Sequence, residues 1–211
     1  MNPDLPARHG LYDPRFEHDA CGVSFVANVK GTKSRSIVDL GLTALMNMEH
    51  RGATGAEPDT GDGAGILIQV PDAFMRATAG VALPAEGSYA AGMAFLPADP
   101  ARCAEAMATV ERITGEEGLR PLGWREVPVV PEAIGPLARA TAPIVRQLII
   151  ERRHGSADDF ERKLYVIRRR IQKAVHAAGI ADSDFAIPSM SAKTVVYKGL
   201  LRATQVRAYY P

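Results

Sequence analysis

The sequence contains only two cysteines, Cys21 and Cys103, among its 211 residues. So few cysteines exclude the disulfide framework that is typical of small secreted domains. The chain also has no cluster of cysteine and histidine residues with the spacing of a zinc site. Two thiols without a disulfide framework favour a reducing, cytoplasmic setting.

An excess of one charge sign and a long apolar run are also missing. The 25 basic and 24 acidic residues give a formal net charge of +1, so electrostatics gives no case for nucleic acid or an anionic membrane as the main partner. No run of eighteen apolar residues occurs that could span a membrane. The hydrophobic content of 46% is enough for a sizeable core, and a small polar or zwitterionic ligand fits this composition best.

Residues 1–20 form a polar, charged leader without a continuous apolar segment, so they do not read as a secretory signal. The simplest interpretation is a frayed N-terminus. The functional interpretation is a propeptide whose removal makes Cys21 the first residue, which leaves residues 21–211 as the domain.

An apolar segment follows this leader directly. Val23, Phe25, Ala27 and Val29 alternate with other residues, and this period of two predicts a β-strand with Cys21 at its start. A free cysteine is most often a small buried hydrophobic residue. Cys21 differs because removal of the leader would give it an α-amine, with a pKa of about 7.7 to 8.0, as a general base beside its own thiol.

The remainder of the chain alternates helical and strand patterns, which predicts layered α/β or α+β packing. Apolar spacing predicts a long amphipathic helix over residues 158–178, with five inward side chains; these are Phe160, Leu164, Ile167, Ile171 and Val175. Other predicted elements are a helix over 36–50 capped by Ser36, strands over 66–70 and 144–150, and a helix over 100–113.

Several conspicuous motifs have simple structural interpretations. Gly61-Asp62-Gly63-Ala64-Gly65 lacks the Lys-Ser/Thr and the following helix of a phosphate loop, and a tight, crowded turn is favoured. His50 and Arg51 at a helix end are typical of capping. Arginines 168–170 oppose an apolar stripe and indicate a solvated helix face, whereas Cys103 belongs to an apolar helix face.

Three blocks in register resemble one known family far more specifically than any block does alone. The blocks are Ala20-Cys21-Gly22-Val23, Met48-Glu49-His50-Arg51-Gly52-Ala53 and Thr60-Gly61-Asp62-Gly63-Ala64-Gly65-Ile66. The similarity continues through Ser189-Met190-Ser191 and Thr194-Val195-Val196-Tyr197-Lys198-Gly199-Leu200. Together they resemble the class II glutamine amidotransferase domain at the start of the glutamate synthase large chain.

The resemblance implies an α+β fold, the four-layer αββα N-terminal nucleophile hydrolase fold, and a propeptide that is cut before Cys21. It implies that Cys21 attacks the side-chain amide of L-glutamine, forms a γ-glutamyl thioester and releases ammonia for glutamate synthesis. Arg51 would order the substrate pocket, while Gly63 and Gly65 would shape the approach of the next strand. No cofactor is expected in this chain. FMN and an iron–sulfur cluster are implied for the full-length enzyme, in a remaining synthase region or companion chain.

The chain departs from the family pattern because two later blocks are absent, His-Gln-Arg-Phe-Ser-Thr-Asn and His-Asn-Gly-Glu. In the family these supply a substrate-binding arginine and the oxyanion donors, and the loss of one such donor typically lowers the rate about 10² to 10³-fold. The sequence therefore predicts an incomplete fold with little or no glutaminase activity alone. Two alternatives stay open: a non-catalytic binding or assembly module with an inert cysteine, and a thiol hydrolase of another amide.

Overall fold

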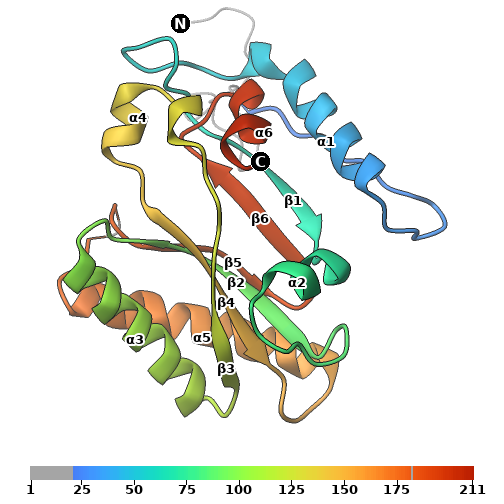
Figure 1. Ribbon diagram of the computed structural model, residues 1–211, viewed down its shortest axis with the longest axis vertical. Helices are drawn as coiled ribbons and strands as arrows, with labels where there is room; N and C mark the ends of the chain where they lie inside the picture. Colours follow the sequence, from blue (N-terminus) through green and yellow to red (C-terminus); the bar gives the residue numbers. More distant parts are fainter. Residues whose placement is uncertain (1–20, 182) are drawn as a thin grey trace, which may run out of the picture.

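Two antiparallel sheets form the centre of the fold in the computed structural model, which describes residues 21–181 and 183–211 (Figure 1). The predicted leader therefore lies outside the described residues. One sheet has four strands in the order β3-β4-β2-β5, and the other is the pair β1-β6. The strands are β1 (Ala64–Gln69), β2 (Tyr89–Leu96), β3 (Arg120–Glu126), β4 (Ile144–Glu151), β5 (Ala186–Ser191) and β6 (Thr194–Gly199).

Six α-helices and three short 3₁₀ turns connect these strands within the described residues. The helices are α1 (Arg35–Asn47), α2 (Asp72–Thr78), α3 (Pro100–Glu116), α4 (Pro136–Ala140), α5 (Ala157–Ala177) and α6 (Val206–Tyr209). The 3₁₀ turns are η2 (Glu49–Arg51), η3 (Pro131–Ala133) and η4 (Ala203–Gln205). The predicted mixture of helices and strands is confirmed, and both sheets are antiparallel.

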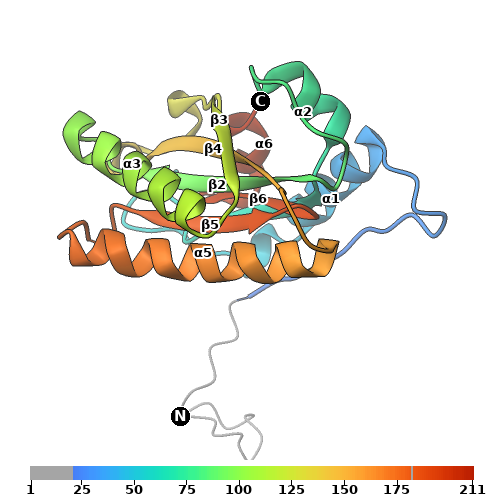
Figure 2. The same cartoon turned by 90° about the horizontal axis from the view of Figure 1, so that it is seen from below.

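Helices α3 and α5 cover one face of the four-stranded sheet, and α5 runs along the strands in Figure 2. The apolar stripe of α5 explains this placement, since all five residues predicted to face inward are buried. They pack against α3 and against alternate residues of β2 and β4, among them Ala90, Ala94 and Leu148. The helical periodicity of the sequence thus identified the main core correctly.

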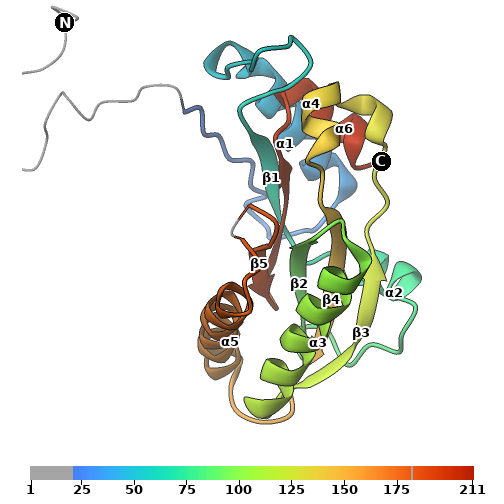
Figure 3. The ribbon, with the colours of Figure 1, turned by 90° about the vertical axis from the view of Figure 1, so that its left-hand side faces the viewer.

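The β1-β6 pair packs against the opposite face of the four-stranded sheet (Figure 3). Ile68 of β1 and Val195 of β6 meet Met93 and Val145 of the larger sheet. The other face of this pair has no such cover within the described residues, and Leu67 is 62% exposed there. The described chain therefore has a helical layer and two sheet layers, with an apolar sheet face turned outward.

A chain of polar side chains joins the two sheets, and its central members, Arg125 and Gln147, are buried. Arg125 Nη1 donates to Gln147 Oε1 over 3.0 Å, and Gln147 Nε2 donates to the Tyr197 hydroxyl over 3.1 Å. Arg125 also donates through Nε to Thr78 Oγ1 over 3.0 Å and lies 5.0 Å from the centre of the Phe74 ring. Because buried polar groups must be paired to avoid a desolvation cost, these contacts favour one mutual position of the sheets.

The strand predicted to begin at Cys21 is not formed. Residues 21–28 have no regular secondary structure, and the side chains of Val23 and Phe25 are 91% and 92% exposed. This blue segment leads into a loop that projects from the body before α1 (Figure 1). A strand needs a neighbouring backbone to accept and donate its hydrogen bonds, and no strand of the described chain pairs with this one. The alternation of apolar residues predicted a strand, but it carried no information about whether a partner strand is present.

The predicted cap of the first helix is also corrected. Ser34, not Ser36, occupies the N-cap position of α1, and its hydroxyl lies 2.8 Å from that of Ser36. Leu42 of α1 is buried in a core cluster, whereas Leu40 is 56% exposed.

The N-terminus of α5 carries a pH-dependent cap. Hydrogen bonds from the Ser156 hydroxyl and amide to the Asp159 carboxylate, followed by that from Arg162, lower the pKa of Asp159 from 3.8 to about 2. A carboxyl group whose pKa is lowered by folding stabilises the folded state above its unfolded pKa and loses that contribution as the pH falls. The cap therefore stabilises α5 above pH 3.8 and is lost between pH 3.8 and about 2.

We expect the Asp159→Asn variant to have a lower melting temperature than the wild type at pH 5, and we expect this difference to shrink as the pH falls through the pKa of Asp159 at about 2. The carboxylate is present only in the wild type at pH 5, whereas well below this pKa neither chain carries a charge at this position. Thermal melts across this pH range test the expectation. In Ser156→Ala, NMR titration should show the Asp159 pKa moved back toward 3.8, and an unchanged titration would contradict the stated cause.

Candidate functional site

Cys21 is the first described residue and is exposed. It precedes the irregular segment that leads to α1, so no sheet holds it in the described structure. Cys103 lies on α3, is buried and is part of the main core cluster. The accessible thiol is therefore Cys21, and the predicted structural role of Cys103 is confirmed.

The His-Arg-Gly block lies directly beside the residue that follows Cys21. A Cβ atom built on Gly22 would lie 3.2 Å from the Arg51 Cβ atom and 3.3 Å from the Met48 sulfur. The backbone at Gly22 therefore packs against the turn that carries Arg51. The structure thus packs the residue that follows Cys21, the predicted nucleophile, against Arg51, the predicted substrate-binding residue, although the two segments are far apart in sequence.

Arg51 is presented by the 3₁₀ turn η2, which continues directly from the end of α1. The Arg51 amide donates to the Met48 carbonyl over 2.8 Å, and the Gly52 amide donates to the Glu49 carbonyl over 3.0 Å. His50 Nδ1 lies 3.1 Å from the Asn47 carbonyl oxygen at the last turn of α1. His50 therefore has the capping contact that the sequence predicted, while Arg51 follows it on the turn beside Gly22.

The glycine-rich segment after this turn forms a compact loop that leads into β1. Thr54 and Gly61 form an isolated antiparallel bridge, the Gly55 amide donates to the Thr60 carbonyl over 2.8 Å, and the Asp62 amide donates to the Ala53 carbonyl over 3.1 Å. These bonds connect the two arms of the loop. We refer to residues 52–63 as the site loop.

Glycine is required in this segment for close backbone approach. A Cβ atom on Gly61 would overlap the Leu201 backbone and lie 2.5 Å from the Arg202 nitrogen. On Gly65 it would lie 2.5 Å from the Lys198 Cβ atom and 2.6 Å from the Tyr197 carbonyl oxygen. Gly63 has a φ of +141°, which other residues rarely adopt. The crowded-turn prediction is confirmed, and the segment enters a strand as expected.

Two side-chain anchors of the site loop were not predicted from the sequence. Arg202 forms an ion pair with Glu49. Glu57 accepts hydrogen bonds from the Thr60 hydroxyl and, over 2.7 Å, from the Leu137 amide. The contacts of Arg202 with Glu49 and of Leu137 with Glu57 join distant parts of the chain, and no local motif marks them. In the sequence, only the charges of Arg202, Glu49 and Glu57 could have indicated that these side chains form anchoring contacts. Charged residues are too common for this signal to identify them.

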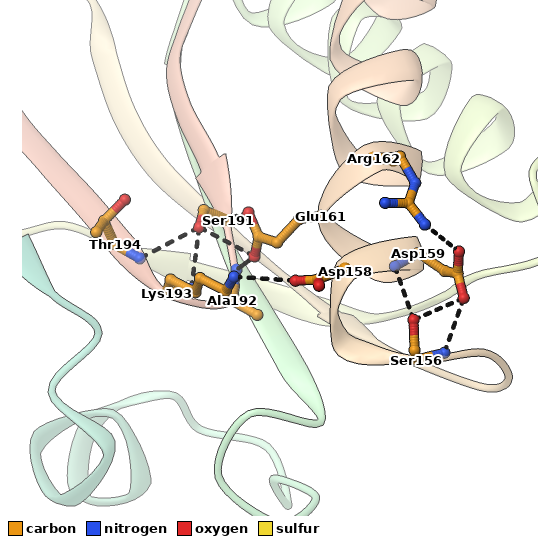
Figure 4. A network of polar contacts seen from close by, with 9 residues as sticks. All are labelled: Ser156, Asp158, Asp159, Glu161, Arg162, Ser191, Ala192, Lys193 and Thr194. Atoms are coloured by element: carbon orange, nitrogen blue, oxygen red, sulfur yellow. Dashed lines mark hydrogen bonds and ion pairs between the residues drawn. The ribbon is translucent and has the colours of Figure 1, made fainter.

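Ser191, the last residue of the Ser189-Met190-Ser191 block, lies at the β5-β6 turn and has structural contacts there (Figure 4). The Ser191 hydroxyl donates to Glu161 Oε2 over 2.9 Å, and the Ala192 amide donates to Glu161 Oε1 over 2.7 Å. The Lys193 amide in turn donates to the Ser191 hydroxyl over 2.9 Å. Glu161 thereby fixes the turn on α5, away from the site loop.

Two cavities of the described structure lie apart from Cys21. One, of about 180 Å³, is bordered by α4, α6 and residues that follow β6, and its walls include Phe185 and Tyr210. The other, of about 290 Å³, is lined by Lys33, Glu86 and Tyr89 among others. Neither has Cys21 or Arg51 in its wall. Cys21 itself is exposed in this structure.

No group of three or more histidine, cysteine, aspartate or glutamate side chains among the described residues is placed to hold a metal ion. Across the same residues, no helix combines the length and the apolar character needed to cross a membrane.

Comparison with known proteins assigns a family to this arrangement. The family model described as "Glutamine amidotransferases class-II" matches residues 21–211. The chain is 42% identical over 209 residues to the glutamate synthase [NADPH] large chain of Bacillus subtilis, which covers 98% of this chain and 14% of that protein.

Two further relatives show the same partial coverage. The glutamate synthase [NADPH] large chain of Azospirillum brasilense is 42% identical over 205 residues, covering 95% of this chain and 13% of its own length. The chloroplastic ferredoxin-dependent glutamate synthase of Oryza sativa subsp. japonica is 40% identical over 198 residues, covering 92% and 12% respectively. The chain thus spans about one seventh or less of the length of these relatives.

Proposed function

Because the chain belongs to the family of class II glutamine amidotransferases, we propose that it is the glutamine-hydrolysing portion of a glutamate synthase, with Cys21 as nucleophile. The observation that carries this proposal is the contact between Gly22 and Arg51. This contact supports the proposal because Gly22 follows the exposed Cys21, and the resemblance assigns substrate binding to the His-Arg-Gly turn that Gly22 contacts. The proposed substrate is L-glutamine.

The proposed reaction begins after removal of residues 1–20, when the α-amine of Cys21 is free. This amine accepts the proton of the thiol, and the thiolate attacks the side-chain carbonyl carbon of glutamine. The carbon–nitrogen bond breaks, the amide nitrogen leaves as ammonia with the proton held by the amine, and a γ-glutamyl thioester remains. Water then attacks the thioester, so that glutamate is released and the thiol is regenerated.

Arg51 would help to order the substrate pocket in this scheme. It lies on the turn that contacts Gly22, and its guanidinium group presents several donors in a fixed plane. Such a group suits the recognition of a carboxylate or a carbonyl oxygen of the amino-acid substrate. The small, zwitterionic character of glutamine also agrees with the near-neutral charge of the chain.

The ammonia would be used by a remaining synthase region or a companion chain, for which FMN and an iron–sulfur cluster are proposed. The residues of this chain do not fit an iron–sulfur cluster, since cluster ligation needs several cysteines close together. Cys21 is exposed and Cys103 is buried in another part of the fold. We assign no step of the reaction in this chain to either cofactor, and we propose a cytoplasmic setting.

We also propose that the complete domain has four layers and that this chain forms only part of it. The support is the uncovered outer face of the β1-β6 pair, with Leu67 62% exposed, together with the exposed apolar residues Val23 and Phe25. An apolar strand-like segment without a partner is costly in water. Additional strands and helices supplied outside this chain would pair with the segment and cover the sheet. Alone, the chain is expected to hydrolyse glutamine weakly or not at all.

Labelling with a glutamine-analogue electrophile, such as the diazoketone analogue, tests the proposed function without requiring turnover. We expect the analogue to alkylate one site, Cys21, and excess L-glutamine to slow the reaction because both compete for the same pocket. Excess D-glutamine is the matched control and should not slow it. The measurement is intact mass against time, which also reports whether residues 1–20 have been removed.

Labelling at the same rate with and without L-glutamine would contradict glutamine recognition and favour the alternative of a non-catalytic binding or assembly module. Retention of residues 1–20 would count against maturation at Cys21. Protection by a different amide, with none by glutamine, would favour a thiol hydrolase of that amide.

A further inference from the structure

Arg202, which lies three residues after β6, contacts both the site loop and the turn η2 that precedes this loop. Its Nε donates to Glu49 Oε1 over 3.0 Å, and Nη2 of the same guanidinium forms an ion pair with that carboxylate. Nη1 donates to the Pro58 carbonyl over 3.4 Å and lies 3.9 Å from the Asp59 carboxylate. One side chain therefore connects the start of η2 with the tip of the site loop.

The backbone of Arg202 is itself held firmly. Its amide donates to Gln205 Oε1 over 2.8 Å, and Gln205 Nε2 donates to the Asp59 carbonyl over 2.8 Å. The preceding residue, Leu201, is buried, and Gly61 packs closely against the backbone of both residues. A side chain on so fixed a backbone loses less freedom on forming its contacts, so it can hold a partner in one position.

Glu49 connects the contacts of Arg202 to the turn that carries Arg51. It is the first residue of η2, and its carbonyl accepts the Gly52 amide over 3.0 Å, which closes the turn around His50 and Arg51. Arg51 is two residues further along and packs against Gly22. The contacts thus run from Arg202 through Glu49 to the turn that carries Arg51, and from there to the residue beside Cys21.

We propose that Arg202 is a positioning residue for the glutamine site, which acts through Glu49 to hold Arg51 against the Cys21 segment. This inference rests on the proposed function for the identity of the ligand. The pair is about one third exposed on both sides, at 34% for Arg202 and 36% for Glu49. Exposed ion pairs add little to stability, so the main effect concerns geometry and not global folding.

Arginine suits this role better than lysine. The guanidinium contacts the Glu49 carboxylate through two nitrogens and the Pro58 carbonyl through a third. A lysine ammonium is a point charge on a flexible stem and cannot maintain this planar arrangement. The Arg202→Lys variant should therefore retain attraction to Glu49 but position the turn less well.

The test compares Arg202→Gln, Arg202→Lys and Glu49→Gln with the wild-type chain. Arg207→Gln is the matched control, because Arg207 also follows β6 and pairs over 2.8 Å with Asp39 of α1 but not with Glu49. Two quantities are measured for each chain. One is the ratio of the Cys21 labelling rates with the glutamine analogue and with iodoacetamide, and the other is amide hydrogen exchange in residues 49–62.

We expect Arg202→Gln and Glu49→Gln to lower the labelling ratio about 10-fold or more, since small misplacements of a binding group have large effects. Exchange in residues 49–62 should become faster in both, while Arg207→Gln matches the wild type. Arg202→Lys should fall between these results. The charge-reversed pair Glu49→Arg with Arg202→Glu should recover part of the ratio, which a loss of general stability would not allow.

A labelling ratio and exchange pattern equal to those of the wild type in Arg202→Gln would overturn the proposal. If Arg202→Gln does not fold, Arg202→Lys and Glu49→Gln decide by the same two measurements. If the proposed function itself is wrong, the result is different, because excess L-glutamine would then not slow the labelling of Cys21 in the wild type. Exchange in residues 49–62 would still decide whether Arg202 holds the turn.

Discussion

Replacing Cys21 with alanine is expected to abolish covalent labelling by the glutamine analogue, from one adduct per chain to none. The reason is that the other thiol, Cys103, lies on the buried face of α3 in the main core and is out of reach of a polar reagent. A thiolate is the most nucleophilic side chain at neutral pH, so no other residue should substitute for it. Intact mass and peptide mapping of the labelled chain give the result directly.

The matched control for this experiment is Cys103→Ala, which should label at the same rate as the wild type. Circular dichroism of both variants checks that the fold is retained. If Cys21→Ala still carries an adduct at the wild-type rate, Cys21 is not the nucleophile and the proposed reaction is wrong.

Replacing Gly61 with alanine is expected to lower the free energy of unfolding by about 3 kcal/mol, at the upper end of the usual cost of overpacking. The added Cβ atom would meet the backbone of Leu201 and lie 2.5 Å from the Arg202 nitrogen. Backbone atoms of a fixed turn cannot move aside as a flexible side chain does. The site loop would have to separate from the segment after β6. Urea unfolding, analysed by linear extrapolation, measures the change.

Gly115→Ala is the control, and we expect it to raise the free energy of unfolding that Gly61→Ala lowers. Gly115 lies in α3, is exposed, and has no heavy atom within 4 Å of the position of the added Cβ. Alanine restricts the unfolded chain more than glycine and favours the helix, so stability should rise by up to about 1 kcal/mol. A similar loss of stability in both variants would show that the close approach at Gly61 is not the cause.

The parts of the fold that could be predicted from the sequence depend on local patterns. Helix α5 was predicted with its five buried residues because a helix displays its buried face at a fixed spacing. The crowded turn before β1 was predicted because glycine density is itself a local signal. Both features are determined by residues close together in the chain.

The parts that could not be predicted depend on partners far away in sequence. Residues 21–29 have strand-like alternation, yet pairing is a property of two segments, and the second is not present among the described strands. Glu49 meets Arg202 across 153 positions, a contact that no spacing rule connects. For the site, the sequence predicts Cys21 and Arg51 but gives no indication of Arg202, whose contacts reach the turn that carries Arg51.

The antiparallel pairing of β1 with β6 also imposes an order of assembly. Ala64, the first residue of β1, pairs with Gly199, the last of β6, so the loop before one strand and the turn after the other emerge at the same end of the sheet. During synthesis the ribosome releases the Cys21 segment early and Arg202 late. Until β6 docks, the nascent chain exposes its thiol without the arginine that anchors the neighbouring turn. The contacts of Arg202 with Glu49 and the site loop therefore form only after synthesis has passed residue 202.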